Sequence, residues 1–260
     1  MESRRARRWL DRHGAADRPT TPLLRARLEA RHRSETLSWV LAGVVMAVAV
    51  ALAVVDELSP APRSERAWLF QVGLFYVAIA LGAVGGLVIQ GRDERRIGAA
   101  LTRRVAHAQA VRVGTVVGRW FLVTTAVTVG GGLLAGLLVA AGAADPRDRE
   151  LGFTMLAAVG AFALIGLVGL VHVVRRPAVA DDEQSLGDDL LLRREDALRA
   201  VAPYPAMLAA IAAVQSQSLA VLLGFLAYAV AAVVVAFLAS WAVERAPAAR
   251  PVSLSREAGA

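Results

Sequence analysis

The stretch Leu151–Val174, LGFTMLAAVGAFALIGLVGLVHVV, has 24 residues and no charged side chain. A helix needs about 20 mostly apolar residues to cross a hydrocarbon core about 30 Å thick. Four more uncharged stretches follow the same pattern, and the five together make up more than half of the 260 residues: Thr36–Val55, Ala67–Gly91, Trp120–Ala144 and Ala200–Val243. This pattern predicts an all-α, multi-pass membrane bundle.

The last stretch, Ala200–Val243, is too long for one crossing. As a single helix at 1.5 Å per residue it would measure about 66 Å, which is about twice the hydrocarbon thickness. Near its middle lie four polar residues, Gln215–Ser218. If they form a turn outside the membrane, the chain has six spans; if an interfacial helix precedes a single span, it has five. The six expected spans are 37–55, 67–90, 120–143, 152–174, 199–215 and 219–242.

The charged segments predict the orientation. Residues 1–35 carry ten arginines against five acidic residues, and residues 92–119 carry seven against two. By contrast, Asp56–Arg66 and Asp145–Glu150 each hold two arginines and three acids. Because arginine accumulates in short cytoplasmic loops, the N-terminus is expected in the cytoplasm and the protein in the cell membrane. The expected parts are a basic cytoplasmic arm (1–35), a bundle (36–243) with cytoplasmic loops at 91–119 and 175–198, and a flexible tail (244–260).

Several classes of function are excluded by composition. The chain has no cysteine, so disulfides, thiolate metal sites and thiol nucleophiles are absent. The predicted spans hold no Asp, Glu, Lys or Arg, and His172 stands without a carboxylate partner there. We therefore expect no enzyme, no catalytic residue, no cofactor and no metal. The net charge of +7 is accounted for by membrane topology, so no nucleic-acid partner is expected.

A few polar side chains lie within the predicted spans. They are Gln71 in the second span, and Thr124, Thr125 and Thr128 in the third. Such residues usually hydrogen-bond between helices or to their own backbone. The alternative is that they line a polar pathway for a small solute.

Glycines recur at one-turn spacing in the second and third spans. The pairs are Gly82 with Gly86 and Gly132 with Gly136. Small residues on one face let helix backbones approach closely, so these pairs are predicted to pack helices within the bundle or, alternatively, in a dimer. The run Gly130–Gly132 could instead kink the third span, as happens at many transporter binding sites.

Two cytoplasmic segments read as amphipathic helices. The Arg-rich segment Arg92–Gly118 is expected to lie on the membrane surface, with its arginines on anionic lipids. The segment Asp181–Arg199 is acidic, and Asp181 is expected to cap its helix together with Gln184. Acidic residues of this segment are candidates for docking a partner: Asp181, Asp182, Glu183, Asp188 and Asp189.

These features together favour a non-catalytic, permease-like or accessory membrane subunit that docks a soluble cytoplasmic partner. The spans carry no recognisable chemistry, whereas the cytoplasmic helices are highly charged. The alternative is a stand-alone passive carrier or channel for a small solute. A homo-oligomer is also compatible with the glycine faces.

Overall fold

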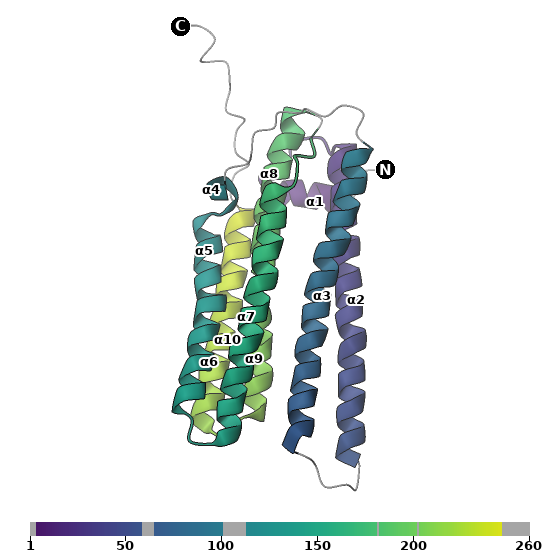
Figure 1. Ribbon diagram of the computed structural model, residues 1–260. Coiled ribbons are helices and arrows are strands. Elements are labelled where there is room, and N and C mark those ends of the chain that lie inside the picture. Colours follow the sequence, from purple (N-terminus) through teal and green to yellow (C-terminus); the bar gives the residue numbers. More distant parts are fainter. Residues whose placement is uncertain (1–3, 59–64, 101–112, 181, 202, 246–260) are drawn as a thin grey trace.

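The computed structural model describes residues 4–58, 65–100, 113–180, 182–201 and 203–245, which are helical apart from short connections (Figure 1). The all-helical prediction is confirmed for this part of the chain. The helices are α1 (Arg4–Arg12), α2 (Pro22–Leu58), α3 (Glu65–Ala99), α4 (Val113–Val116), α5 (Arg119–Thr125), the π-helical turn η1 (Ala126–Gly130), α6 (Gly131–Gly142), α7 (Pro146–Arg175), α8 (Glu183–Ala200), α9 (Tyr204–Gln215) and α10 (Leu219–Glu244).

Within the described residues, five helical segments are long and apolar enough to cross a membrane. They are Gly73–Ala99, Arg119–Gly142, Pro146–Arg175, Gln184–Gln215 and Leu219–Glu244. Large apolar side chains also cover the outer faces; Leu138 is 64% and Phe237 68% exposed. Soluble proteins rarely expose extended apolar surface of this kind. By helix length and hydropathy the chain is a candidate multi-pass membrane protein.

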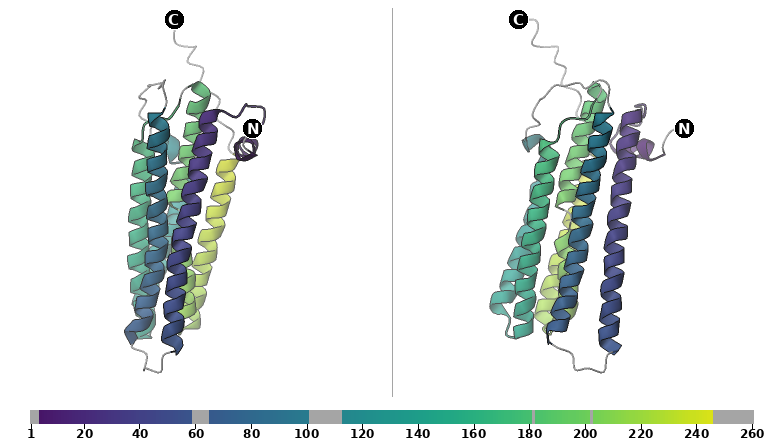
Figure 2. Two further views of the ribbon diagram at one scale, coloured as in Figure 1. Left: turned by 90° about the vertical axis from the view of Figure 1, so that its right-hand side faces the viewer. Right: turned by 45° about the vertical axis from the view of Figure 1, so that its right-hand side comes forward.

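The long helices run side by side in two groups (Figures 1 and 2). In one group, α2 and α3 pack against each other as an antiparallel hairpin. In the other, α5 to α10 form a bundle whose core is buried between α7, α9 and α10, with Met155, Leu208 and Phe225 fully enclosed. We call these groups the hairpin and the bundle.

The two ends of the molecule differ. At the upper end of Figure 1 lie α1, α8 and the end of α10, where Arg12 and Glu244 form an ion pair of 2.7 Å. At the lower end, residues 143–145 join α6 to α7, and residues 216–218 join α9 to α10. The sequence predicts a chain reversal at this second turn.

The basic N-terminal segment is largely helical and continuous with the first predicted span. α2 begins at Pro22, where the hydroxyl of Thr21 accepts a hydrogen bond from the backbone N–H of Leu24. It then continues without a break to Leu58, so residue 35 is not a helix boundary. The helix α3 likewise continues to Ala99, which includes the first residues of the expected surface helix at 92–118; residues 101–112 lie outside the described part.

The third predicted span contains a π-helical turn that ends where the run Gly130–Gly132, the alternative site of a kink, begins. The turn η1 ends at Gly130, and the helix continues through α6 without a break. The hydroxyl of Tyr228 on α10 donates a hydrogen bond to the backbone carbonyl of Thr128 inside this turn. A methyl group at Gly132 would lie 2.7 Å from the Tyr228 hydroxyl, so the glycine leaves the space that this side chain occupies.

Candidate functional site

A cavity of about 610 Å³ lies between the hairpin and the bundle. Its lining comes from α2 and α3 on one side and from α5, η1, α7, α8 and α9 on the other. We call it the bundle cavity. Clefts of about 300 to 1,000 Å³ are the usual size for small-molecule sites, and they often lie between helices of a bundle.

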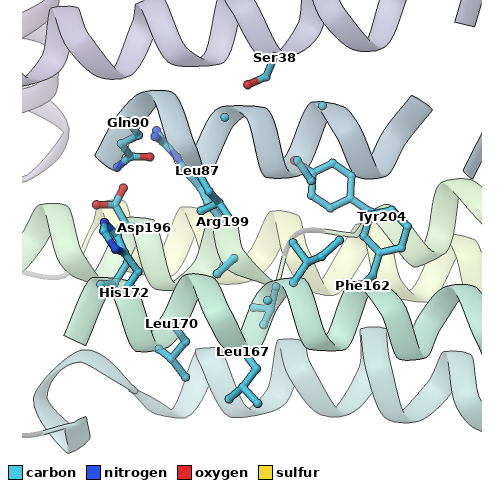
Figure 3. A pocket seen from close by; sticks show the side chains of 18 of the residues that line it. Ser38, Leu87, Gln90, Phe162, Leu167, Leu170, His172, Asp196, Arg199 and Tyr204 are labelled. Atoms are coloured by element: carbon cyan, nitrogen blue, oxygen red, sulfur yellow. The ribbon is translucent and has the colours of Figure 1, made fainter. Parts of the chain in front are cut away.

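The bundle cavity has an apolar part and a polar end. In the apolar part, Phe162 stacks on Tyr204 with the ring centroids 5.6 Å apart. Figure 3 shows these two rings at one end of the cavity and Gln90, His172 and Arg199 gathered at the other. The apolar lining also includes Ile79, Leu87, Ile165, Leu167, Leu170 and Met207. The charged residues of the polar end are Glu35, Glu94, Arg176, Asp196 and Arg199.

The cavity opens sideways as well. Trp39, Leu167 and Met207 line the cavity and are 66%, 56% and 40% exposed, so the cavity is not enclosed at these residues. If the long apolar helices span a membrane, this opening faces lipid. An amphipathic molecule could then enter from the bilayer and keep its polar group at the polar end.

Ion pairs join the hairpin to the bundle at the polar end of the cavity. Glu94 of α3 pairs with Arg176, which also pairs with Asp196 of α8 at 3.0 Å, and all three side chains are buried. Arg31 of α2 pairs with Asp196 and, at 2.6 Å, with Glu195. Burial would lower the pKa of Arg31, but the two carboxylates outweigh this and raise it. The positive charges of Arg31 and Arg176 are therefore balanced by the carboxylates of Glu94, Glu195 and Asp196.

A second buried group of charges lies beside the first. Asp189 of α8 pairs with Arg27 and with Arg193, at 2.7 Å in both cases, and all three side chains are at most 3% exposed. Arg193 also donates to the backbone carbonyl of Val173. Burial lowers the pKa of Arg27, and the negative charge of Asp189 opposes that shift. Removing one partner of such a group would leave a buried charge without compensation.

One ion pair at the polar end differs in exposure. Glu35 of α2 and Arg199 of α8 pair at 2.8 Å, but their side chains are 44% and 46% exposed. Because solvent reaches both groups, this pair contributes little to stability and can exchange partners.

The helix α1 is held on α8 by apolar and polar contacts. Trp9 and Leu10 are buried against Leu192, and the indole N–H of Trp9 donates to Glu195 at 3.0 Å. Nδ1 of His13 lies 2.8 Å from the carbonyl oxygen of Trp9, and Nε2 lies 3.2 Å from Glu195. Both ring nitrogens thus face acceptors, which favours the doubly protonated imidazolium. Burial alone would lower the pKa of His13, but these two contacts raise it above its usual value.

A second cavity, of about 840 Å³, lies at the upper end between α1, α2, α8 and α10. The exposed arginines Arg5 and Arg8 of α1 line one side, and Ser240 and Val243 of α10 line another. We call it the surface cavity. Its arginines lie at the end of the molecule that the arginine distribution predicts to be cytoplasmic.

The polar residues predicted within the spans are partly brought together. Thr125 and Thr128 line the bundle cavity, whereas Thr124 lines the surface cavity. The hydroxyls of Thr125 and Thr128 donate to backbone carbonyls one turn earlier, at Phe121 and Thr124. The side chain of Gln71 lies outside the described residues.

The four predicted glycines lie at helix contacts or at the cavity. Gly82 lines the bundle cavity, and a methyl group at Gly86 would lie 2.5 Å from the Ser38 hydroxyl of α2. At Gly136, a methyl group would lie 3.1 Å from the Leu156 side chain of α7. Gly132 faces Tyr228, as described above. Among the described glycines, the shortest of these distances occurs at Gly152 of α7, which the sequence did not single out: a methyl group there would lie 2.4 Å from the backbone nitrogen of Ala140.

The acidic residues proposed for docking have different positions. Asp188 and Asp189 are buried, at 3% and 1% exposure, and Asp189 is fully engaged by arginines. Asp182 is exposed and caps α8, in a capping box with Ser185. The cap is thus one residue later than predicted from Asp181, which lies outside the described residues, as does the side chain of Glu183.

Sequence reasoning did not identify the arginines that hold α8. Arg27 and Arg31 are four residues apart in a helix, and Asp189 and Asp196 are seven apart, so each pair lies on one helix face. That spacing was the available signal. In the part of the chain that the structure describes, no group of three or more His, Cys, Asp or Glu residues is placed to hold a metal ion. No protein-family model, curated protein or solved structure matches this chain.

Proposed function

We propose that this protein is a non-catalytic, permease-like membrane protein that takes an amphipathic small molecule into the bundle cavity. The observation that carries the proposal is the cavity itself, with apolar walls, a charged polar end and a sideways opening. A molecule with an apolar body and one polar group matches this division. Thr125 and Thr128, for which a polar pathway was the alternative to helix packing, line the same cavity.

The proposal includes six spans, with both chain ends in the cytoplasm of the cell. The hydrogen bond from the Gln217 backbone to Asp148 keeps the α9–α10 turn beside the start of α7. The α6–α7 turn is expected outside the cell because Asp145–Glu150 holds more acidic residues than arginines, and arginine accumulates in cytoplasmic loops. Together these observations favour a crossing by α9 and the end of α8. The first span lies within α2.

The experiment measures binding of a defined amphiphile. A fatty acid with a dansyl group at its chain end should bind the purified protein saturably, with increased fluorescence. Gly43 lines the cavity, and a methyl group there would meet nothing within 4 Å, so Gly43→Phe should fill the cavity without disturbing packing. We expect Gly43→Phe to weaken binding at least tenfold.

Gly224→Phe is the matched control. Gly224 is exposed on α10, away from both cavities, and a methyl group there would also meet nothing within 4 Å. This variant should bind the dansyl fatty acid as the unmodified protein does. Equal binding by both phenylalanine variants would refute the proposal.

A second candidate function is an accessory subunit with a soluble cytoplasmic partner. It is favoured by one observation: ion pairs and apolar contacts fix α1, the start of α2 and α8 into one body at the upper end. Arg5 and Arg8 are exposed there and could contact a partner or anionic lipids. A stoichiometric partner that co-purifies in mild detergent, and is lost in Arg5→Glu/Arg8→Glu, would support this candidate.

A further inference from the structure

We propose that the occupant of the bundle cavity is a phospholipid, with an acyl chain against the apolar wall and its phosphate on Arg199. This inference rests on the proposed function and names the class of its ligand. Three features carry it: the sideways opening, the apolar wall and one exchangeable arginine at the polar end.

The opening determines where the ligand comes from. Trp39, Leu167 and Met207 line the cavity and are at least 40% exposed. In a membrane these exposed faces contact acyl chains, so a lipid can place one chain in the cavity without leaving the bilayer. Tryptophan prefers the headgroup level, and Trp39 lies beside the polar end, on the same helix as Glu35.

The wall determines which part of the lipid is buried. Below the polar end, the lining is built from Leu87, Ile165 and Leu170, and from the stacked rings of Phe162 and Tyr204. The volume of about 610 Å³ is in the range of sites for small molecules. Such a wall provides contacts for methylene groups and few for a polar solute.

The ion pairs determine which charge can be bound. Arg176 is buried, and its guanidinium is already matched by Glu94 and Asp196. Arg199 is half exposed, and its only ion-pair partner given by the structure is the half-exposed Glu35. A phosphate can therefore replace the Glu35 carboxylate on Arg199 without stranding a buried charge. Arginine suits this role because its planar guanidinium can make two parallel hydrogen bonds to phosphate oxygens.

Two neighbours add polar contacts. Gln90 of α3 and His172 of α7 lie at the same end of the cavity as Arg199 (Figure 3). Gln90 now makes a long contact of 3.5 Å with Glu94, so its amide is weakly engaged. Both side chains can donate to a phosphate oxygen.

The test uses native mass spectrometry of the detergent-purified protein with lipids of identical acyl chains. Phosphatidylglycerol should remain bound at one copy per chain, at least tenfold more tightly than diacylglycerol, which lacks the phosphate. Gly43→Phe should lose the bound lipid, whereas Gly224→Phe should retain it.

Two variants separate the phosphate contact from the ion pair. Arg199→Gln and Glu35→Gln both break the same pair, but only the first removes the phosphate ligand. Arg199→Gln should abolish the preference over diacylglycerol, and Glu35→Gln should keep or strengthen it. Equal effects of the two variants, or no difference between the two lipids, would overturn the inference. If the dansyl fatty acid still binds in a Gly43-dependent manner while phosphatidylglycerol does not, the proposed function stands and the phospholipid assignment falls.

Discussion

The backbone N–H of Gln217 donates a hydrogen bond to Oδ1 of Asp148, with 3.1 Å between the two atoms. Asp148 is fully buried in the first turn of α7, and Gln217 lies in the turn between α9 and α10. The side chains of Arg147 and Gln215 also approach to 3.5 Å. Two turns that are distant in sequence thus meet at the lower end.

This contact leads to a prediction about topology. Because the chain lacks cysteine, single cysteines can be labelled without background. A membrane-impermeant maleimide added to intact cells should label Ala144→Cys and Gln217→Cys at the lower end. It should label Ala16→Cys and Arg245→Cys only after the cells are opened. External labelling of Arg245→Cys would indicate five spans.

Asp148→Ala should destabilise the protein. The exposed Gln217 would lose its N–H acceptor at a partly buried contact, at a cost of about 1 kcal/mol. Asp148→Asn keeps an oxygen at this position, so its thermal unfolding midpoint should lie between those of the alanine variant and the unmodified protein. A midpoint of Asp148→Ala equal to that of the unmodified protein would contradict this role.

Glycines at helix contacts and at the exposed surface should respond oppositely to alanine. A methyl group at Gly152 would lie 2.4 Å from the backbone nitrogen of Ala140, so Gly152→Ala should force α6 and α7 apart and cost about 1–3 kcal/mol. At Gly160 a methyl group would meet nothing within 4 Å. Gly160→Ala should therefore stabilise the helix by about 0.5–1 kcal/mol. Thermal unfolding in detergent measures both, and similar shifts would argue against the tight contact.

The buried and exposed ion pairs should differ in their contribution to stability. Asp189→Ala leaves Arg27 and Arg193 buried without a carboxylate, so a loss of about 3–5 kcal/mol is expected. Glu35→Gln breaks a half-exposed pair and should cost at most about 1 kcal/mol. Unfolding of the two variants in the same detergent measures the difference. A small effect of Asp189→Ala would show that the pairs are not buried as described.

The docking of α1 should depend on pH through His13. The pKa of His13 is raised in the folded protein, so its stabilising contribution is fully present below about pH 6.5, the value of a free histidine. It is lost as pH rises through the folded-state pKa, when Nε2 no longer donates toward Glu195. The carboxylates beside Arg31 raise its pKa further above this range, so Arg31 stays charged throughout.

Thermal unfolding at pH 6 and at pH 9 measures this effect when the protein is compared with His13→Gln. The unmodified protein should be more stable than the variant at pH 6, and the gap should shrink at pH 9. If the difference in stability between the two proteins is the same at pH 6 and pH 9, His13 is not the group responsible for the pH dependence.

Much of the helical architecture was predictable because membrane helices must satisfy their backbone internally and need long apolar runs. Three of the five apolar segments found in the described residues start or end within one residue of the boundary of an uncharged stretch of the sequence. The turn at Ser216 was predictable because polar residues interrupt an otherwise apolar run.

The cavity and the clusters of buried ion pairs were harder to predict from the sequence. Arg31 and Asp196 are separated by 165 positions, and helix spacing gives the face of each residue but not its partner. The arginines of the first 35 residues were counted as a sign of topology, although Arg27 and Arg31 are buried in ion pairs. The bundle cavity depends on how the hairpin leans against α7 and α9, and single-helix patterns contain no information on that.

The π-helical turn η1 changes the direction in which the residues after it face, compared with a regular α-helix of the same sequence. Each residue of an α-helix advances the facing direction by about 100°, and a π turn inserts one additional residue into the helix. Above the turn, Phe121 is buried near α8; below it, Gly136 faces α7. If the same residues formed a regular α-helix throughout, Gly136 would be turned about 100° away from α7, whereas deleting one residue from Ala126–Gly130 would restore a regular helix and keep Gly136 toward α7. One segment thereby serves two neighbours with faces that a uniform helix could not present together.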